Sequence, residues 1–153
     1  MIEPQNQIMQ PQIMEQAISS FFRTFELVCN SSAPADAARA FAENFLYADG
    51  EGAKVLPREA LAAGIGQRGR MMEQAGYGPS VLERLDTELL DEHYARVTTV
   101  WRIDPVSRLS TVEPIHLRAT YLVEVREGAV QILAYFSHTN LRSLVHSGGE
   151  GKP

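Results

Sequence analysis

Two side chains in this 153-residue chain are candidates for proton transfer: the carboxylate of Asp49 and the imidazole of His138. Asp49 directly follows residues 46–48, which include Tyr47, and a carboxylate held against aromatic rings has its pKa raised and can act as a general base. The structural alternative is a turn, because the aspartate of an Asp-Gly pair such as Asp49-Gly50 commonly binds its own backbone. The residue types leave both interpretations open.

His138 lies at the end of a predicted hairpin. Residues 117–138 predict two strands folded about Glu127-Gly128, with Arg126 opposite Ala129. One side of this hairpin is then almost wholly apolar, and we expect it to face the helices. Its pairs are Val125/Val130, Val123/Ile132, Tyr121/Ala134, Ala119/Phe136 and Leu117/His138. At the rim of that side, His138 could act as an acid, a base or a ligand donor, and could pair with Asp49. The alternative is a half-exposed histidine at a strand end.

Five large side chains could line an apolar pocket for a flat organic molecule. Aromatic rings offer broad contact area, and methionine adapts its shape to a ligand. The five are Tyr47, Met71, Trp101, Tyr121 and Phe136. The alternative is a solid core. In the strand predicted over residues 94–103, the side chains expected to point inward are Ala95, Val97, Thr99 and Trp101.

The opposite side of the predicted hairpin carries residues that favour self-association. Thr120, Leu122, Leu133 and Tyr135 would share that side, which is too apolar to be left fully exposed to water. One patch serves both subunits of a symmetric dimer, so we expect a homodimer formed through the outer face of the sheet.

Helices that would hold these residues come first along the chain. After a flexible arm over residues 1–10, Pro11 suits the first turn of a helix. Its apolar stripe is predicted at Ile13, Ala17, Phe21, Phe25 and Val28, widened by Ile18 and Phe22. A second helix begins near Pro34 and presents Ala37, Ala38, Phe41, Ala42 and Phe45, with a short strand over residues 45–48. A third, interrupted helix begins at Pro57 and runs through Ala75.

Strands follow the helices. Residues 81–90 and 94–103 alternate in polarity, and together with the final hairpin they predict a four-stranded antiparallel meander. This order predicts an α+β fold with helices on one face of a sheet. We expect one domain over residues 11–141 and a disordered tail over residues 142–153.

Several functional classes are disfavoured by composition. The net charge of −5 and the lack of a basic patch argue against a nucleic-acid partner. No apolar run approaches the ~20 residues that span a bilayer, and no signal pattern opens the chain, so we expect a cytoplasmic protein without a membrane partner. The histidines are scattered and Cys29 is the only cysteine, so we expect an inert thiol and neither a metal site nor a cofactor.

A glycine motif at Gly64-Ile-Gly-Gln-Arg-Gly69 matches the dinucleotide-binding pattern. That pattern requires a strand directly before it, whereas the preceding residues predict a helix. We interpret the glycines as a bend between two helical pieces, with Arg68 or Arg70 near the rim of a cavity.

Five segments together resemble the NTF2-like superfamily, in particular its SnoaL-like (polyketide-cyclase-like, DUF4440-type) branch. They are Phe21-Phe22, Phe41–Gly50, Pro57–Leu61, Leu90–Trp101 and Ile132–His138. The resemblance implies a cystatin-like, cone-shaped barrel in which three N-terminal helices pack on a curved antiparallel sheet. It also implies a ligand cavity and dimerisation through the outer sheet face.

The resemblance leaves the activity open. In the ketosteroid-isomerase-like branch the catalytic aspartate falls at the position of Asp49. The tyrosine that binds the oxyanion would fall near Phe25, which has no hydroxyl, so ketosteroid isomerase activity is not expected. We expect binding of a small hydrophobic molecule. The alternatives are a cofactor-independent isomerase, cyclase or hydratase that uses Asp49 as its base, and a structural dimerisation module without a ligand.

Overall fold

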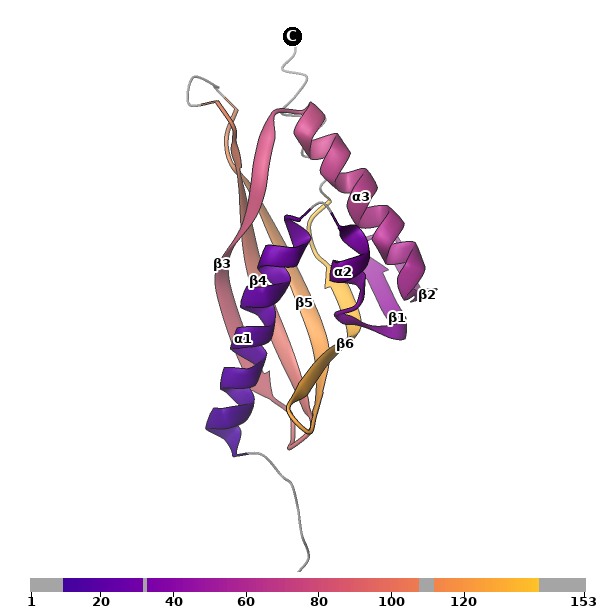
Figure 1. The fold of residues 1–153 in the computed structure, drawn as a ribbon, viewed down its shortest axis with the longest axis vertical. Helices are drawn as coiled ribbons and strands as arrows, with labels where there is room; N and C mark the ends of the chain where they lie inside the picture. The colour runs from indigo at the N-terminus through magenta and orange to yellow at the C-terminus, as the bar shows by residue number, and fades with distance from the viewer. Residues whose placement is uncertain (1–9, 32, 108–111, 141–153) are drawn as a thin grey trace, which may run out of the picture.

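Three helices pack on a six-stranded sheet in the computed structural model, which describes residues 10–31, 33–107 and 112–140 (Figure 1). The elements in chain order are α1 (Pro11–Cys29), α2 (Pro34–Ala38), β1 (Phe41–Asp49), β2 (Gly52–Pro57), α3 (Arg58–Gln74), β3 (Tyr77–Leu89), β4 (Tyr94–Pro105), β5 (Ile115–Arg126) and β6 (Ala129–Ser137). The predicted α+β class is confirmed. Residues 1–9 of the arm predicted over residues 1–10, and the tail predicted over residues 142–153, lie outside the described residues.

The strand order in the sheet is β2-β1-β6-β5-β4-β3, and the sheet is open. Strands β3 to β6 form the predicted antiparallel meander. The sheet extends beyond the meander because β1 pairs with β6 in the parallel direction and β2 pairs with β1. The sheet is therefore mixed rather than purely antiparallel.

Helix α1 packs on the part of the sheet formed by β3, β4 and β5. Pro11 occupies its first turn, as predicted, and its buried residues are Met14, Ile18, Phe22 and Phe25. This stripe is rotated from the predicted one, and Ile13 is 48% exposed. The row of apolar residues that contains Phe21 and the row that contains Phe22 both fit the period of a helix. The row that packs on the sheet is the second one, and Phe22 is fully buried.

Helix α2 is shorter than predicted. It ends at Ala38, and Phe41, Ala42 and Phe45 belong to β1 rather than to the helix. Phe41 pairs with Ile132 of β6, so tertiary pairing overrides the helical spacing of these residues. Helix α3 runs unbroken through Gly64, so the predicted bend is wrong.

A bulge in β6 changes which residues face the helices. The predicted pairing holds from Arg126/Ala129 to Val123/Ile132 and then shifts. Beyond the shift, Tyr121 pairs with Tyr135 and Thr120 pairs with Phe136. An extra residue reverses the side to which every following side chain points. Tyr135 therefore joins the helix-facing side, and Phe136 joins the outer side. The predicted pairs Tyr121/Ala134, Ala119/Phe136 and Leu117/His138 are wrong.

The phase of β4 is as predicted. Ala95, Val97, Thr99 and Trp101 are buried, while the intervening residues are at least partly exposed. The Trp101 indole N–H donates to the Thr99 hydroxyl oxygen over 3.0 Å, and that hydroxyl donates to the Ala119 carbonyl over 3.2 Å. These bonds satisfy the polar atoms that β4 buries.

The last turns of α1 attach to the edge strand β3 through side chains that imitate a neighbouring strand. The Asn30 amide donates to the Ser80 carbonyl (2.8 Å) and accepts from the Ser80 N–H (2.9 Å). Glu26 accepts from the Leu82 N–H (2.8 Å). The backbone groups of Ser80 and the Leu82 N–H are thus paired at this edge of the sheet, and these bonds attach α1 to the sheet.

Candidate functional site

Asp49 is the last residue of β1, and its carboxylate is exposed and caps a turn. One oxygen accepts from the Glu51 N–H over 2.9 Å, and the other accepts from the Tyr47 hydroxyl over 3.0 Å. These bonds, led by the one from Glu51, hold the pKa of Asp49 below its ordinary value. Of the two interpretations of Asp49, the structure shows the turn; the raised pKa of the other is not found, because the carboxylate is exposed and hydrogen-bonded instead of being buried. A role for Asp49 as a base stays a prediction.

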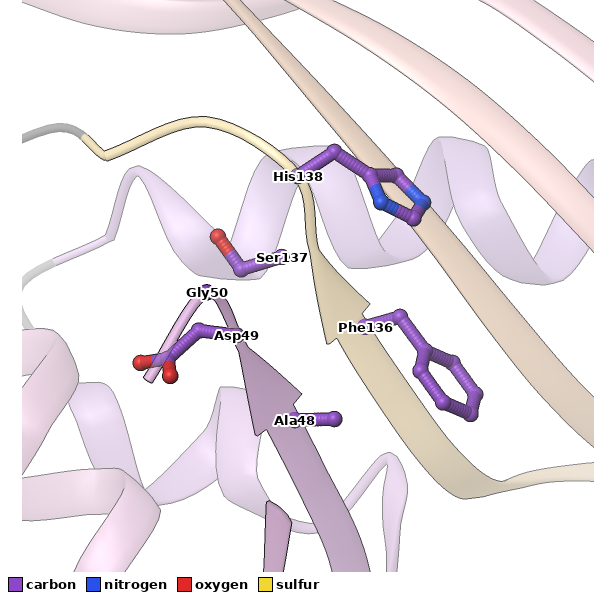
Figure 2. A pocket seen from close by; sticks show the side chains of 6 residues that line it. All are labelled: Ala48, Asp49, Gly50, Phe136, Ser137 and His138. Atoms are coloured by element: carbon purple, nitrogen blue, oxygen red, sulfur yellow. The ribbon is translucent and has the colours of Figure 1, made fainter. Parts of the chain in front are cut away.

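His138 lies on the outer side of the sheet. Its Nε2 is 2.7 Å from the Thr120 hydroxyl oxygen, and its backbone N–H donates to the Arg118 carbonyl. The predicted helix-facing position is wrong because of the bulge in β6. Figure 2 shows the Asp49 carboxylate and the His138 ring on opposite sides of the strands. The structure does not bring them together as an acid–base pair.

An open depression of about 260 Å³ lies where β1 and β6 end together. It is lined by Ala48, Asp49, Gly50, Phe136, Ser137 and His138. Ala48, Phe136 and His138 point to one side of it, and Asp49 points to the other (Figure 2). The depression thus lies across the ends of these two strands, is open to solvent, and encloses neither the Asp49 carboxylate nor the His138 ring.

The five residues predicted to line one pocket are divided by the structure. Tyr121 and Trp101 are buried in an aromatic core, where the Phe22 and Tyr121 ring centroids are 5.0 Å apart. Phe136 is on the outer side, as described above. Tyr47 and Met71 are half-buried and pack against the core from the helix-facing side.

Three tyrosines instead form a row across β5, β6 and β1. The rings of Tyr121 and Tyr135 are stacked, with centroids 5.1 Å apart and an interplanar angle of 6°. Tyr47 meets Tyr135 edge-on at 5.6 Å. Tyr121 is buried, whereas Tyr47 and Tyr135 are half-buried. The end of the row formed by Tyr135 and Tyr47 therefore leaves aromatic surface partly exposed.

Arg68 of α3 lies near this row, since its charge acts on Tyr47 and Tyr121. It lies in a helical stripe with apolar residues that contact the core, at spacings of one helical turn. The other members are Leu61, Ile65, Met72 and Ala75. Arg68 is half-buried, and its side chain forms no hydrogen bond or ion pair with any described residue.

The charge of Arg68 reaches three titratable groups around the row. Burial raises the pKa of the Cys29 thiol to about 11, and burial together with the Asp49 hydrogen bond raises the pKa of Tyr47 to about 12. Burial also raises the pKa of Tyr121. In each case the positive charge of Arg68 acts in the opposite direction, because it favours the ionised form. We call Cys29, Tyr47, Arg68, Tyr121 and Tyr135 the tyrosine–arginine cluster.

The chemistry of this cluster suits binding better than nucleophilic attack. A thiol with a pKa of about 11 is protonated at neutral pH, in agreement with the predicted inert Cys29. Phenols with raised pKa values are hydrogen-bond donors rather than bases. Arg68 supplies a positive charge that is already partly removed from water.

A signal for Arg68 is present in the sequence. It follows Leu61 by seven residues and precedes Met72 by four, so helical spacing alone places it among core-facing positions. The predicted bend at residues 64–69 is incompatible with this stripe, because the stripe requires one continuous helix. Tyr135 carried no such signal, because its side of the sheet depends on the bulge.

The described residues contain neither a candidate metal site nor a helix that could span a membrane. In residues 10–31, 33–107 and 112–140 there is no group of three or more His, Cys, Asp or Glu side chains able to hold a metal ion. Within the same ranges no helix combines the length and apolar character needed to cross a bilayer. The cytoplasmic location stays a prediction.

Comparison with known proteins supports the fold. A family model described as NTF2-like protein (DUF6841) matches residues 11–140. No functionally curated protein has a significant match. The predicted NTF2-like, cystatin-like fold is confirmed, and assignment to the SnoaL-like branch stays a prediction.

Solved structures with the same fold have low sequence identity to this chain. A Mycobacterium tuberculosis protein of unknown function has a TM-score of 0.68 at 14% identity, with 84% of this chain and 77% of that chain covered. A candidate scytalone dehydratase from Novosphingobium aromaticivorans has a TM-score of 0.67 at 13% identity, with coverages of 85% and 86%. An NTF2-like protein with a cystatin-like fold from the same species has a TM-score of 0.65 at 14% identity, with coverages of 87% and 90%. At these identities the likeness extends to the fold alone.

Proposed function

The chain belongs to the NTF2-like family DUF6841, and we propose that it binds a small, flat, hydrophobic molecule against the tyrosine–arginine cluster. One observation carries this proposal. The stacked pair of Tyr121 and Tyr135 continues into Tyr47, and the rings of Tyr135 and Tyr47 are only half-buried.

Contact with a flat ligand is more favourable for such an apolar surface than contact with water. Half-buried aromatic rings leave apolar area that a flat molecule could cover by stacking. The Tyr135 hydroxyl forms no hydrogen bond with a described residue, so it is available to orient a polar group. Mostly apolar surfaces with a few convergent polar groups are the usual form of small-molecule sites.

Native mass spectrometry of gently purified protein tests this proposal. We expect a discrete adduct on each subunit, and we expect Tyr135→Ala to remove it. Tyr94→Ala is the matched control, because Tyr94 lies on β4, away from the cluster, and bonds to Glu124 and Arg126. A protein with no adduct, whose thermal unfolding midpoint also does not respond to flat aromatic compounds, would favour the structural dimerisation module instead.

A second candidate is a cofactor-independent isomerase, cyclase or hydratase. It is favoured by the fold shared with a candidate scytalone dehydratase and by the hydrogen bond from Tyr47 to Asp49. Asp49 would act as the base in that case. If the adduct found by native mass spectrometry is a substrate, we expect Asp49→Asn to abolish its conversion while changing its affinity for the protein by less than about tenfold. Undiminished conversion in this variant would remove Asp49 from the mechanism.

We also propose a homodimer formed through the outer face of the sheet. The bulge revises the predicted interface, because Tyr135 faces the helices while Thr120 and Leu122 remain outside. An apolar band crosses this face in two paired rows. Its members include Val55, Leu46, Ala134 and Leu122 in one row and Ala48, Phe136 and Thr120 in the next, and Leu133 lies at the bulge.

The mass of the protein in solution tests the dimer. At micromolar concentration we expect twice the chain mass for the natural protein and a single-chain mass for Phe136→Arg, which places a charge in the apolar band. Val106→Arg is the control, because Val106 is 70% exposed and lies in the loop after β4. A monomeric natural protein would contradict this proposal.

A further inference from the structure

The inward stripe of α3 contains one charged residue among apolar ones. Leu61, Ile65 and Met72 of that stripe pack against the core, and Arg68 lies between Ile65 and Met72 on the same side of the helix. Glycine or alanine at this position would pack without desolvating a charge. A cation kept at a core-facing position needs a compensating partner.

The other described arginines show how unusual Arg68 is. Six of them form ion pairs with carboxylates: Arg23, Arg39, Arg84, Arg96, Arg102 and Arg126. Arg58 donates to the Phe41 carbonyl over 2.7 Å. In the described part of the chain Arg68, Arg70 and Arg118 have no side-chain partner, and of these three only Arg68 is half-buried. The exposed guanidinium groups of Arg70 and Arg118 are hydrated by solvent, whereas the half-buried Arg68 is less accessible to water.

We infer that Arg68 is the subsite for an anionic group on the bound molecule, so that the ligand is an aromatic acid whose carboxylate or sulfonate pairs with the guanidinium while its ring lies on Tyr135 and Tyr47. This inference rests on the proposed function, since it assigns the polar end of the same ligand.

The geometry of an arginine fits this role. A planar guanidinium donates two parallel hydrogen bonds to an oxyanion, which fixes orientation as well as charge. The unpartnered Tyr135 hydroxyl could donate a third. The raised pKa values of the Cys29 thiol and of the Tyr47 and Tyr121 phenols keep these groups neutral at physiological pH, so they place no competing negative charge beside Arg68.

A pair of fluorescent probes separates the two ends of the ligand. Anilinonaphthalene sulfonate carries the anionic group, and phenylnaphthylamine is the same aromatic scaffold without it. Dissociation constants for both would be measured by fluorescence titration with the natural protein, Arg68→Gln and Arg68→Lys. Arg70→Gln is the matched control, because it removes the same charge from the exposed side of the same helix.

We expect Arg68→Gln to weaken the sulfonate probe about tenfold or more, which is the usual loss for a hydrogen bond to a charged group. Binding of phenylnaphthylamine should change less than about twofold. Arg68→Lys should keep part of the preference for the sulfonate, and Arg70→Gln should keep all of it. Thermal unfolding of each variant establishes that it is folded.

Two results would overturn this assignment in distinguishable ways. If both probes bind and Arg68→Gln weakens them equally or not at all, the anionic subsite is wrong while the proposed binding function stands. If neither probe binds the natural protein, the aromatic surface does not accept such ligands, and the proposed function is contradicted together with the subsite.

Discussion

Replacing Arg68 by methionine should make the protein more stable. The side chain sits in an apolar stripe of α3, half-buried and without a partner among the described residues. If it is kept for a ligand, the unliganded fold bears the cost of removing part of its charge from water. Methionine is unbranched and close in length to the aliphatic stem of arginine, so it can follow the path of that stem between Ile65 and Met72.

The expected gain follows from what changes at this position. Arginine and methionine have nearly equal helix propensity, so the backbone contributes little. The aliphatic stem is already packed in both residues. What remains is the exchange of a half-desolvated cation for one additional apolar group, a gain of about 1 kcal/mol in the free energy of unfolding.

Urea denaturation at a fixed protein concentration measures this effect. With a slope of about 2 kcal/mol/M, a gain of about 1 kcal/mol raises the unfolding midpoint by about 0.5 M. The concentration is held constant because the midpoint of a dimer depends on it. Arg70→Met is the control, and it should change the free energy by less than about 0.5 kcal/mol because Arg70 is exposed.

A lower midpoint for Arg68→Met, with the slope unchanged, would refute the reasoning. It would mean that the guanidinium supports the fold itself. A large change in the slope would indicate a different unfolded or native state and would require the comparison to be made with Arg68→Leu.

Two further predictions concern the fold and its titration. Asn30→Asp should destabilise the protein by about 1–2 kcal/mol, because its carboxylate would face the Ser80 and Glu26 carbonyls to which the amide donates. The loss should be at least as large as that caused by Asn30→Ala. Chemical denaturation at pH 7 measures both losses, and an aspartate variant clearly more stable than the alanine variant would contradict the prediction. Stability should fall as the pH rises from about 10 to 12, because the pKa of Tyr47 is about 10 in the unfolded chain and about 12 in the folded one. Tyr47→Phe should make this fall shallower. Urea midpoints that change identically with pH in both proteins would count against the raised pKa of Tyr47.

The sequence predicts those parts of the fold whose signals are local. Pro11 marks the start of α1, and alternation along β4 identifies the inward-facing positions, as the structure confirms. These positions are Ala95, Val97, Thr99 and Trp101. The turn at Glu127-Gly128 is also local: both residues have positive φ, which glycine adopts freely. The first pairs of the β5–β6 hairpin follow from it.

Long-range pairing explains what the sequence could not predict. The spacing of Phe41 and Phe45 fits a helix as well as a strand, and only their packing beside β6 makes them strand residues. The bulge in β6 has no motif of its own, yet it decides the sides of Tyr135, Phe136 and His138. The candidate site therefore required the structure, although the helical position of Arg68 could have been derived from spacing.

The parallel pairing of β1 with β6 also constrains the order in which the chain can fold. Phe41 pairs with Ile132, and the Ile132 N–H donates to the Ala40 carbonyl over 2.9 Å. During synthesis β1 leaves the ribosome with only β2 available as a neighbour, and its other edge stays open until β6 is made. Closing so long a loop is slow, and an unpaired strand edge invites contacts with other chains in the meantime. The pairing of the strand that carries Tyr47 is therefore completed last, and the row of Tyr47, Tyr135 and Tyr121 can form only once nearly the whole sheet has been assembled.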